Sequence, residues 1–300
     1  MSDGVQKSTK VTYSAPQKMF QKFCTHLGIS ALPASDNTLL LFITHLHQRN
    51  LSLGTVKVYM SAIITLHNML GLVPPNSKNP KIRLALRAIK NSSPAPGQKS
   101  PITFNLLLSI WQVIDRLPDN YCIKAALSLG FFGGLRGAEY LLTQFSSGPK
   151  LSQISFSKCT KFMYYKVKKS KTKPHGFTIS LACSHHTICA VCCMTQYLQL
   201  RHCSSVPKDT DPLLVWKGSE LSKQTLNVVI KDLVASIGLV PTNYSIHSLR
   251  SGVATTAALN NFKEWEIKKL GGWASNTYLT YIRHSTRHTT HFARRLAHNK

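Results

Sequence analysis

One short segment, about a third of the way along the chain, divides the sequence into two parts. The segment 91–101 reads NSSPAPGQKSP, with three prolines and no apolar residue larger than alanine. Such a stretch has nothing to bury in a core and is typical of a linker. The 300 residues are enough for two ordinary domains. We therefore expect a first domain over 11–91, a linker over 92–100 and a second domain over 101–300.

The part before the linker has helical periodicity throughout. Apolar residues recur at helical spacing over 19–27, 39–46 and 56–70. A fourth helix, over about 81–90, places isoleucine and leucine against lysine and arginine. We expect this domain to be all helical.

The part after the linker mixes two periodicities. Period-two apolar runs cover 151–156, 162–167 and 177–181. Helical patterns cover 103–117, 120–133, 136–145, 188–203, 222–238, 247–260, 263–271 and 275–283. The predicted fold class of the whole chain is therefore mainly α with a small β-sheet.

The charge of the chain indicates its partner. There are 37 Lys and Arg against 11 Asp and Glu, a formal net charge of +26, and no acidic residue occurs over 37–114, 140–208 or 267–300. Long segments can therefore face phosphates without local repulsion, which favours nucleic acid. A membrane-surface protein would need an amphipathic basic helix or a lipid-anchor motif, and the sequence has neither, nor a membrane-spanning apolar run. We expect a soluble, intracellular protein with no membrane partner.

Five short motifs occur in a fixed order. Residues 133–139 read GGLRGAE, and residues 169–173 read KSKTK between two predicted strands. Further on come HSLR at 247–250, LGGW at 270–273 and YIR at 281–283. In this order and at these distances the motifs resemble the boxes of the tyrosine recombinase/integrase family, over nearly the whole chain. FFGGLRGAE, KSKT and HSLRSGVATTAA are most similar to eukaryotic mobile-element recombinases of the DIRS, Ngaro and Crypton kind, and the GGW and YIR boxes are Cre-like.

The resemblance implies a two-domain DNA clamp. The first domain would be a helical, SAM-like core-binding domain and the second the catalytic domain. The implied activity is site-specific DNA strand exchange, in which duplex DNA is cut and rejoined through a 3′-phosphotyrosyl intermediate. Because the phosphotyrosyl bond conserves the energy of the broken linkage, no cofactor, neither ATP nor a metal, is expected.

The resemblance also implies a set of catalytic residues: Arg136, Lys171, His247, Arg250, Trp273 and Tyr281. Two guanidinium groups suit the charge that develops on the non-bridging phosphate oxygens. A lysine crowded by other lysines suits a general acid for the leaving 5′-oxygen. The histidine would assist the attacking phenol or hold the phosphate, and the indole N–H would donate beside it.

Each of these residues, taken singly, also has an ordinary structural explanation, and it is their joint order that favours the site. Tyr278 competes with Tyr281 as nucleophile because both lie on one predicted helix. Only one of two tyrosines three residues apart can face a fixed phosphate, and the YIR box favours Tyr281. Gly272 departs from the many family members that have His or Arg there, which removes one possible phosphate contact.

A cluster of cysteines and histidines raises a separate question. Cys189 and Cys192 have C-x-x-C spacing, and Cys183 with His186 are two further potential zinc ligands. The alternative is that these residues, like the other cysteines of this chain, are reduced and structural. The sequence leaves both interpretations open.

Other functional classes are less consistent with the sequence. A metal-dependent transposase or nuclease needs converging carboxylates, and the chain has 11 mostly isolated acids. A type IB topoisomerase would share the chemistry but act as a monomer. The main alternative is a domesticated, catalytically silent recombinase fold that only binds DNA or assembles.

The resemblance implies further partners and a location. We expect double-stranded DNA as partner, a homo-oligomer, most simply a tetramer on two DNA sites, and residence in the nucleus. The tail 285–300 carries Phe292 and Leu296 on one face of a short predicted helix. A helix this short must dock to be stable, either on its own domain or on a neighbouring protomer.

Overall fold

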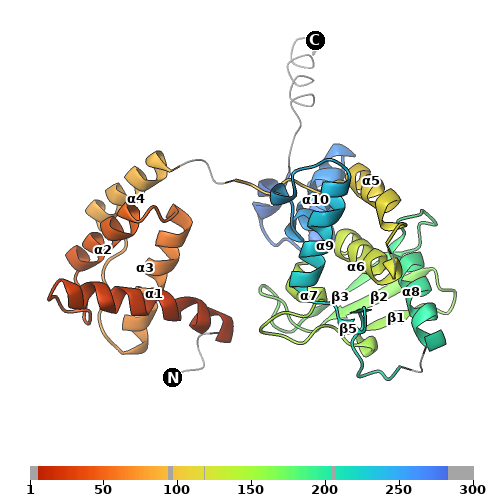
Figure 1. The fold of residues 1–300 in the computed structure, drawn as a ribbon, viewed down its shortest axis with the longest axis horizontal. Coiled ribbons are helices and arrows are strands. Elements are labelled where there is room, and N and C mark those ends of the chain that lie inside the picture. The colour runs from red at the N-terminus through yellow and green to blue at the C-terminus, as the bar shows by residue number, and fades with distance from the viewer. Residues whose placement is uncertain (1–5, 94–96, 118, 205–206, 283–300) are drawn as a thin grey trace, which may run out of the picture. The chain divides into compact units, whose positions relative to one another are not determined.

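The computed structural model describes residues 6–93, 97–117, 119–204 and 207–282. The chain forms two compact units, Met1–Gly97 and Gln98–Lys300, called unit 1 and unit 2 below. Both units are mainly helical, as Figure 1 shows. The expected fold class, mainly α with a small β-sheet, is confirmed. No helix in the described part of the chain is both long and apolar enough to cross a membrane.

Unit 1 contains four described helices: α1 (Lys7–His26), α2 (Asp36–Gln48), α3 (Leu53–Met69) and α4 (Pro80–Ser92). Hydroxyl side chains fix two of the helix starts, since Ser35 accepts from the Thr38 N–H and Ser52 from the Thr55 N–H. The helices enclose one core, in which Phe20 and Phe42 are fully buried. The helices expected in this part are therefore all present.

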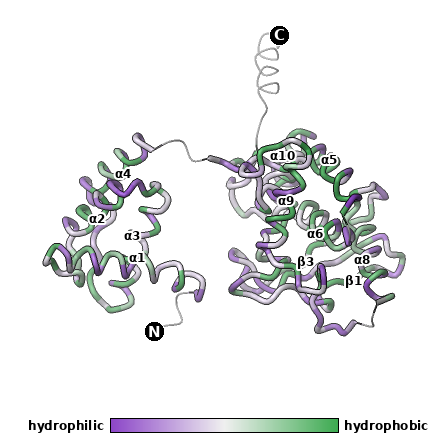
Figure 2. Tube along the Cα trace, viewed as in Figure 1, coloured by the Kyte–Doolittle hydropathy of each residue, from purple (hydrophilic) through white to green (hydrophobic). Residues whose placement is uncertain are grey.

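Unit 2 contains the remaining elements, of which the helices are α5 (Phe104–Ile114), α6 (Asn120–Phe132), α7 (Gly137–Tyr140), α8 (Ala190–Ser204), α9 (Lys223–Ser236), α10 (His247–Leu259) and α11 (Glu264–Gly271). Short 3-10 helices are η2 (Leu151–Gln153), η3 (Pro241–Asn243) and η4 (Asn276–Thr280). Figure 2 shows the mainly apolar character of α5 and α6, which contribute to the core of this unit.

The strands of unit 2 form a three-stranded antiparallel sheet in the order β1 (Ile154–Phe156), β2 (Phe162–Val167) and β3 (Phe177–Ala182). Along β2 buried and exposed residues alternate, so one face of the sheet packs on the core and the other faces solvent. The β2–β3 register, which pairs Val167 with Phe177, leaves 168–176 as the hairpin loop. A second, two-stranded sheet, β4 (Val215–Trp216) with β5 (Ser219–Glu220), was not predicted.

Two predicted helices are shorter than their patterns indicated. The helix expected over 136–145 ends at Tyr140, because Leu142 pairs with the chain at Ser222 instead and a Thr143–Ser146 turn follows. The helix expected over 275–283 is the 3-10 helix η4. There the Thr280 hydroxyl donates to the Thr277 carbonyl, a local side-chain bond that competes with regular helix.

The C-terminal end of the predicted linker is bound to unit 2. The Ser100 N–H donates to the Asn243 carbonyl at 2.7 Å, and the Ile102 N–H donates to the Ser248 carbonyl at 2.8 Å. The backbone at Ile102 lies so close to α10 that a Cβ on Gly252 would come 1.8 Å from the Ile102 carbonyl oxygen. This approach explains why a glycine is needed at position 252 of α10.

Candidate active site

The side chain of Arg250 forms the centre of the site. It projects from α10 and is 1% exposed. Its guanidinium donates to the carbonyls of Gly134 and Gly271, the second at 2.7 Å, and lies 4.5 Å from the centre of the Trp273 ring. Arg250 therefore joins the three motifs that carry Gly134, itself and Trp273.

Glycines make this junction possible. Gly134 has φ +54, and a Cβ there would come within 2.9 Å of the Gly271 Cα. A Cβ on Gly271 would in turn come 2.1 Å from the Trp273 ring. Gly272 ends α11 with φ +61. The doubled glycines of both boxes are thus explained by close backbone approach and left-handed φ values.

Burial and neighbouring charges act on the ionisation of Arg250. Burial lowers its pKa to about 10, and the positive charge of Arg136 acts in the same direction. The carboxylate of Glu139 and the side chain of Tyr281, through its charge and a hydrogen bond, act in the opposite direction. The group remains a cation at neutral pH, and its surroundings already favour added negative charge.

Arg136 precedes α7 and is held by an acidic partner. Its Nη1 donates to Glu139 Oε1 at 2.9 Å, and its backbone N–H donates to Glu139 Oε2 at 2.7 Å. The Arg136 side chain is 31% exposed, whereas that of Glu139 is 3% exposed. Glu139 also accepts from the Ser170 hydroxyl at 2.6 Å and, through its carbonyl, from Tyr165 at 2.8 Å. The buried carboxylate therefore ties Arg136 to the hairpin loop.

The hairpin loop carries the predicted general acid. Lys171 directly follows the anchored Ser170, so its backbone begins beside the Arg136–Glu139 pair, but its side chain is exposed. The side chain of Lys173 lies over the Phe177 ring at 4.5 Å and lines a groove of about 690 Å³ together with Arg250. Two lysines of the loop thus remain candidates on geometric grounds.

His247 begins α10 and faces the predicted nucleophile. Its ring centroid is 5.1 Å from that of Tyr281, with the rings at 64°. Partial desolvation, followed by the charges of Arg250 and other nearby cations, lowers the pKa of His247 below its usual value. The lowered pKa favours the neutral imidazole at neutral pH, which is able to accept a proton.

The two candidate tyrosines lie in different surroundings. Tyr281 is half-buried, with its ring 5.6 Å from that of Trp273. Tyr278 is 5% exposed and lies under the ammonium of Lys268, 5.8 Å from its ring centre. Only Tyr281 has both His247 and Arg250 as neighbours in the described structure.

Trp273 is buried, and its indole N–H has no hydrogen-bond partner within the described ranges. An unpaired buried donor costs about 1–3 kcal/mol, so a ligand oxygen at this place would be favoured.

Five of the six predicted residues form one cluster, and the exception is Lys171, whose side chain is exposed. Arg283 of the YIR box and the tail 285–300 lie outside the described residues.

Glu139 and Ser170 were not predicted as site residues.

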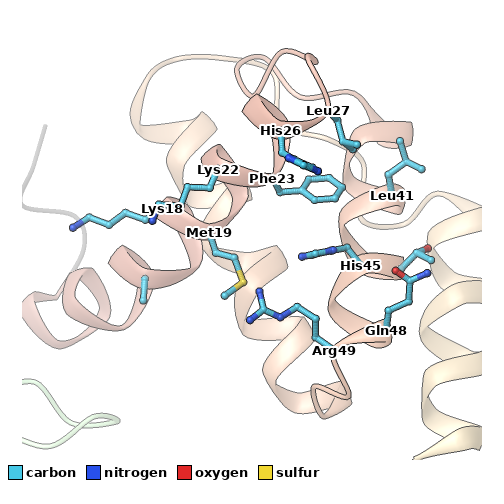
Figure 3. Close-up of a pocket in the computed structure, with 12 residues that line it drawn as sticks. Lys18, Met19, Lys22, Phe23, His26, Leu27, Leu41, His45, Gln48 and Arg49 are labelled. Carbon is cyan, nitrogen blue, oxygen red and sulfur yellow. The ribbon is translucent and has the colours of Figure 1, made fainter.

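Unit 1 holds a basic groove of about 860 Å³ that was not predicted from the sequence. Figure 3 shows it between α1 and α2, with the rings of Phe23 and His45 facing each other, 4.9 Å apart. The basic residues that line it are Lys18, Lys22 and His26 on α1, His45 on α2 and Arg49 directly after α2. The four-residue spacing of these basic side chains on each helix is the signal that would have found it.

Comparisons with known proteins agree with this geometry. No family model matches the chain. The integrase/recombinase XerD homolog of Selenomonas ruminantium is 25% identical over 273 residues, which cover 87% of this chain and 77% of that protein.

Solved structures with the same fold include the Tn1549 transposon integrase in complex with transposon right end DNA. Its TM-score is 0.66 at 12% identity, and the match covers 98% of this chain and 95% of that one. The XerH site-specific recombinase bound to palindromic difH substrate has a TM-score of 0.66 at 19% identity, with 94% and 78% covered. A lambda integrase dimer bound to a COC′ core site has a TM-score of 0.62 at 16% identity, with 95% and 92% covered. The chain therefore has the fold of the tyrosine recombinase/integrase family and is similar in sequence to one of its members.

Proposed function

We propose that this protein is a site-specific DNA recombinase or integrase of a mobile element, which cuts and rejoins duplex DNA through Tyr281. The observation that carries the proposal is the placement of a half-buried phenol beside His247, Trp273 and the buried guanidinium of Arg250. The direct test is to trap a covalent protein–DNA adduct on a nicked duplex and to map the residue that carries it.

The proposed reaction is an in-line transesterification. The Tyr281 oxygen forms a bond to phosphorus, the bond from phosphorus to the 5′-oxygen breaks, and the 3′-phosphate stays on the tyrosine. The phenol proton passes to the neutral His247 imidazole, and the leaving 5′-oxygen receives a proton from a lysine of the hairpin loop. Arg136, Arg250 and the free indole N–H of Trp273 stabilise the charge on the non-bridging oxygens.

Which lysine donates the proton is testable with a sulfur-substituted substrate. Lys171→Ala is expected to cut ordinary DNA slowly and to recover on a bridging 5′-phosphorothiolate, because a thiolate leaves without a general acid. Lys173→Ala should be slowed far less and show no comparable rescue. The measurement is the single-turnover cleavage rate of both variants on both substrates. Rescue of Lys173→Ala alone would assign the proton to Lys173, whose side chain lines the groove of Arg250.

A catalytically silent descendant is the second candidate, and one observation favours it. The Arg250 guanidinium hydrogen-bonds two backbone carbonyls, as a purely structural arginine would. Such a protein would bind DNA but yield no adduct with any nicked substrate. The adduct assay therefore separates the two candidates.

The proposal also covers the partner, the origin and the cellular location of the protein. Double-stranded DNA as partner is supported by the net charge of +26 and by the basic groove of unit 1. The eukaryotic mobile-element origin and the nuclear location rest on the similarity of FFGGLRGAE, KSKT and HSLRSGVATTAA to DIRS, Ngaro and Crypton recombinases. A fluorescent fusion of the whole chain that stays outside the nucleus would exclude the location.

We also propose assembly into a tetramer on two DNA sites through the tail. Deletion of 289–300, or replacement of Phe292 and Leu296 by Asp, is expected to leave binding to a single site nearly intact and to abolish synapsis, because the apolar stripe would dock on the next protomer. Native gels and light scattering with one and two DNA sites measure this. A truncated protein that still pairs sites and recombines at the normal rate would show that the tail only caps its own unit.

A further inference from the structure

A second cluster of reactive side chains lies in unit 2, where β3 ends and α8 begins. Cys183 directly follows β3, and His185 lies in the loop that leads from β3 to α8. Cys189 directly precedes α8, and Cys192 lies in its first turn. The Cys183 Sγ lies 3.4 Å from the Cys192 Sγ, 3.7 Å from the Cys189 Sγ and 3.6 Å from the His185 Nδ1. The ligand atoms of Cys183, His185 and Cys192 all lie within 4.8 Å of one another.

The separations among Cys183, His185 and Cys192 are those of a tetrahedral zinc site, and the Cys189 Sγ lies close to one of these three residues, Cys183. With Zn–S bonds of about 2.3 Å and Zn–N bonds of about 2.0–2.1 Å, tetrahedral ligands lie roughly 3.8 Å apart for two sulfurs and roughly 3.6 Å apart for sulfur and nitrogen. The sulfurs are too far apart for a disulfide, whose S–S bond is about 2.05 Å. The arrangement therefore fits a shared ion better than a covalent bridge.

The backbone holds the sulfurs in this arrangement. The N–H groups of Ser184 and Cys192 point at the Cys189 Sγ, at 3.3 and 3.5 Å, as backbone donors do around a metal-bound thiolate. The N–H of Cys183 donates to the Lys161 carbonyl of the chain entering β2, at 2.7 Å. These bonds fix two of the cysteines on different elements before any ion binds.

The choice between the two adjacent histidines is also settled by the backbone. His185 has φ +53, a backbone conformation that residues other than glycine seldom adopt. In this conformation its imidazole lies beside the Cys183 sulfur. His186, the ligand considered from sequence, instead packs its ring against Phe104 at 5.2 Å and accepts the Ile188 N–H at 3.2 Å. His186 is therefore committed elsewhere.

We propose that Cys183, His185 and Cys192 bind one Zn²⁺, and that Cys189, whose Sγ lies 3.7 Å from that of Cys183, completes a closed structural site as the fourth ligand. Three thiolates and one imidazole form a soft ligand set that selects zinc over magnesium or calcium. The ion fastens the end of β3 to the start of α8, and so braces the hairpin whose loop carries the lysines. The ion takes no part in the strand-transfer chemistry, so this inference does not depend on the proposed function.

The test is the metal content of the full-length protein, purified with a thiol reductant and without chelator. Elemental analysis should give close to one zinc per chain, and replacement by Co²⁺ should give the absorption bands of a tetrahedral thiolate site. Cys192→Ser and His185→Ala should lose the metal. Both residues are exposed, so neither substitution should disturb the core. Circular dichroism checks that both variants fold.

Two residues of the same types as the proposed ligands serve as controls. His186→Ala and Cys203→Ser, the latter exposed on the same helix, should keep one zinc per chain. Chelation should lower the thermal unfolding midpoint of the wild type and of these controls, but not that of His185→Ala. Equal zinc content in His185→Ala and His186→Ala, or a zinc-free wild type that folds with unchanged stability when zinc is added, would overturn the proposal.

Discussion

Replacement of Tyr281 by Phe is expected to abolish the covalent protein–DNA adduct while leaving DNA affinity unchanged. The ring contacts to His247 and Trp273, at 5.1 and 5.6 Å, need only the aromatic ring, so the variant should fold and bind. The lost hydroxyl is the proposed nucleophile, and no other group can then form the phosphotyrosyl bond. The measurement is the denaturing-gel shift of the protein on a nicked duplex carrying the element's terminal sequence.

Tyr278→Phe is the matched control, because it removes the same atom three residues away. Tyr278 is buried beneath Lys268, with its ring 6.4 Å from that of Trp273, so its variant should still form the adduct. Peptide mapping of the wild-type adduct should identify Tyr281. An adduct formed by Tyr281→Phe would overturn the assignment, and failure of the wild type on every nicked substrate would favour the silent alternative.

Removal of either site arginine is expected to lower cleavage by orders of magnitude. Loss of one donor to a developing oxyanion costs about 10²–10³-fold in rate, and Arg136→Ala or Arg250→Ala removes a cation as well. Arg136→Ala is the cleaner variant, because its side chain is 31% exposed and Glu139 keeps the Ser170 hydroxyl as a partner. Single-turnover cleavage at saturating protein measures the effect separately from DNA binding.

Arg250 needs a control for its structural role. Arg201→Ala supplies one, since Arg201 on α8 also donates to two backbone carbonyls, those of Pro212 and Leu213. Both variants should lose stability in thermal unfolding, but only Arg250→Ala should lose cleavage. Rates within tenfold of wild type for Arg136→Ala and Arg250→Ala would contradict the proposed charge stabilisation.

The cluster could be predicted because its members lie in short motifs that resemble those of the tyrosine recombinase/integrase family, and the structure shows the local geometry that these motifs adopt. Arg250 and His247 begin one helix, and Gly134 and Gly272 are required by φ values that few other residues tolerate. The links between motifs were not predictable, because they depend on contacts between distant segments. The Ser170–Glu139 hydrogen bond joins residues 31 positions apart.

Local competition explains the other differences. The helix expected after Arg136 ends early because Leu142 finds a partner at Ser222, which no periodicity reveals. The choice of His185 over His186 as the proposed zinc ligand follows from the φ of +53 at His185, which residue spacing in the sequence does not reveal. Sequence motifs thus predicted which residues come together in the site, whereas contacts between distant segments determine how each side chain is positioned.

The attachment of the linker's end to unit 2 bears on how the two units would act together on DNA. Helix α4 ends at Ser92, and the chain is bound again at Ser100. The tether between Ser93 and Ser100 therefore spans at most roughly 25 Å when fully extended. Under the proposed function, a duplex captured by one unit meets the other at an effective concentration on the order of millimolar. Two salt-sensitive contacts would then reinforce each other, so the affinity of the linked units for DNA would exceed that of either unit alone.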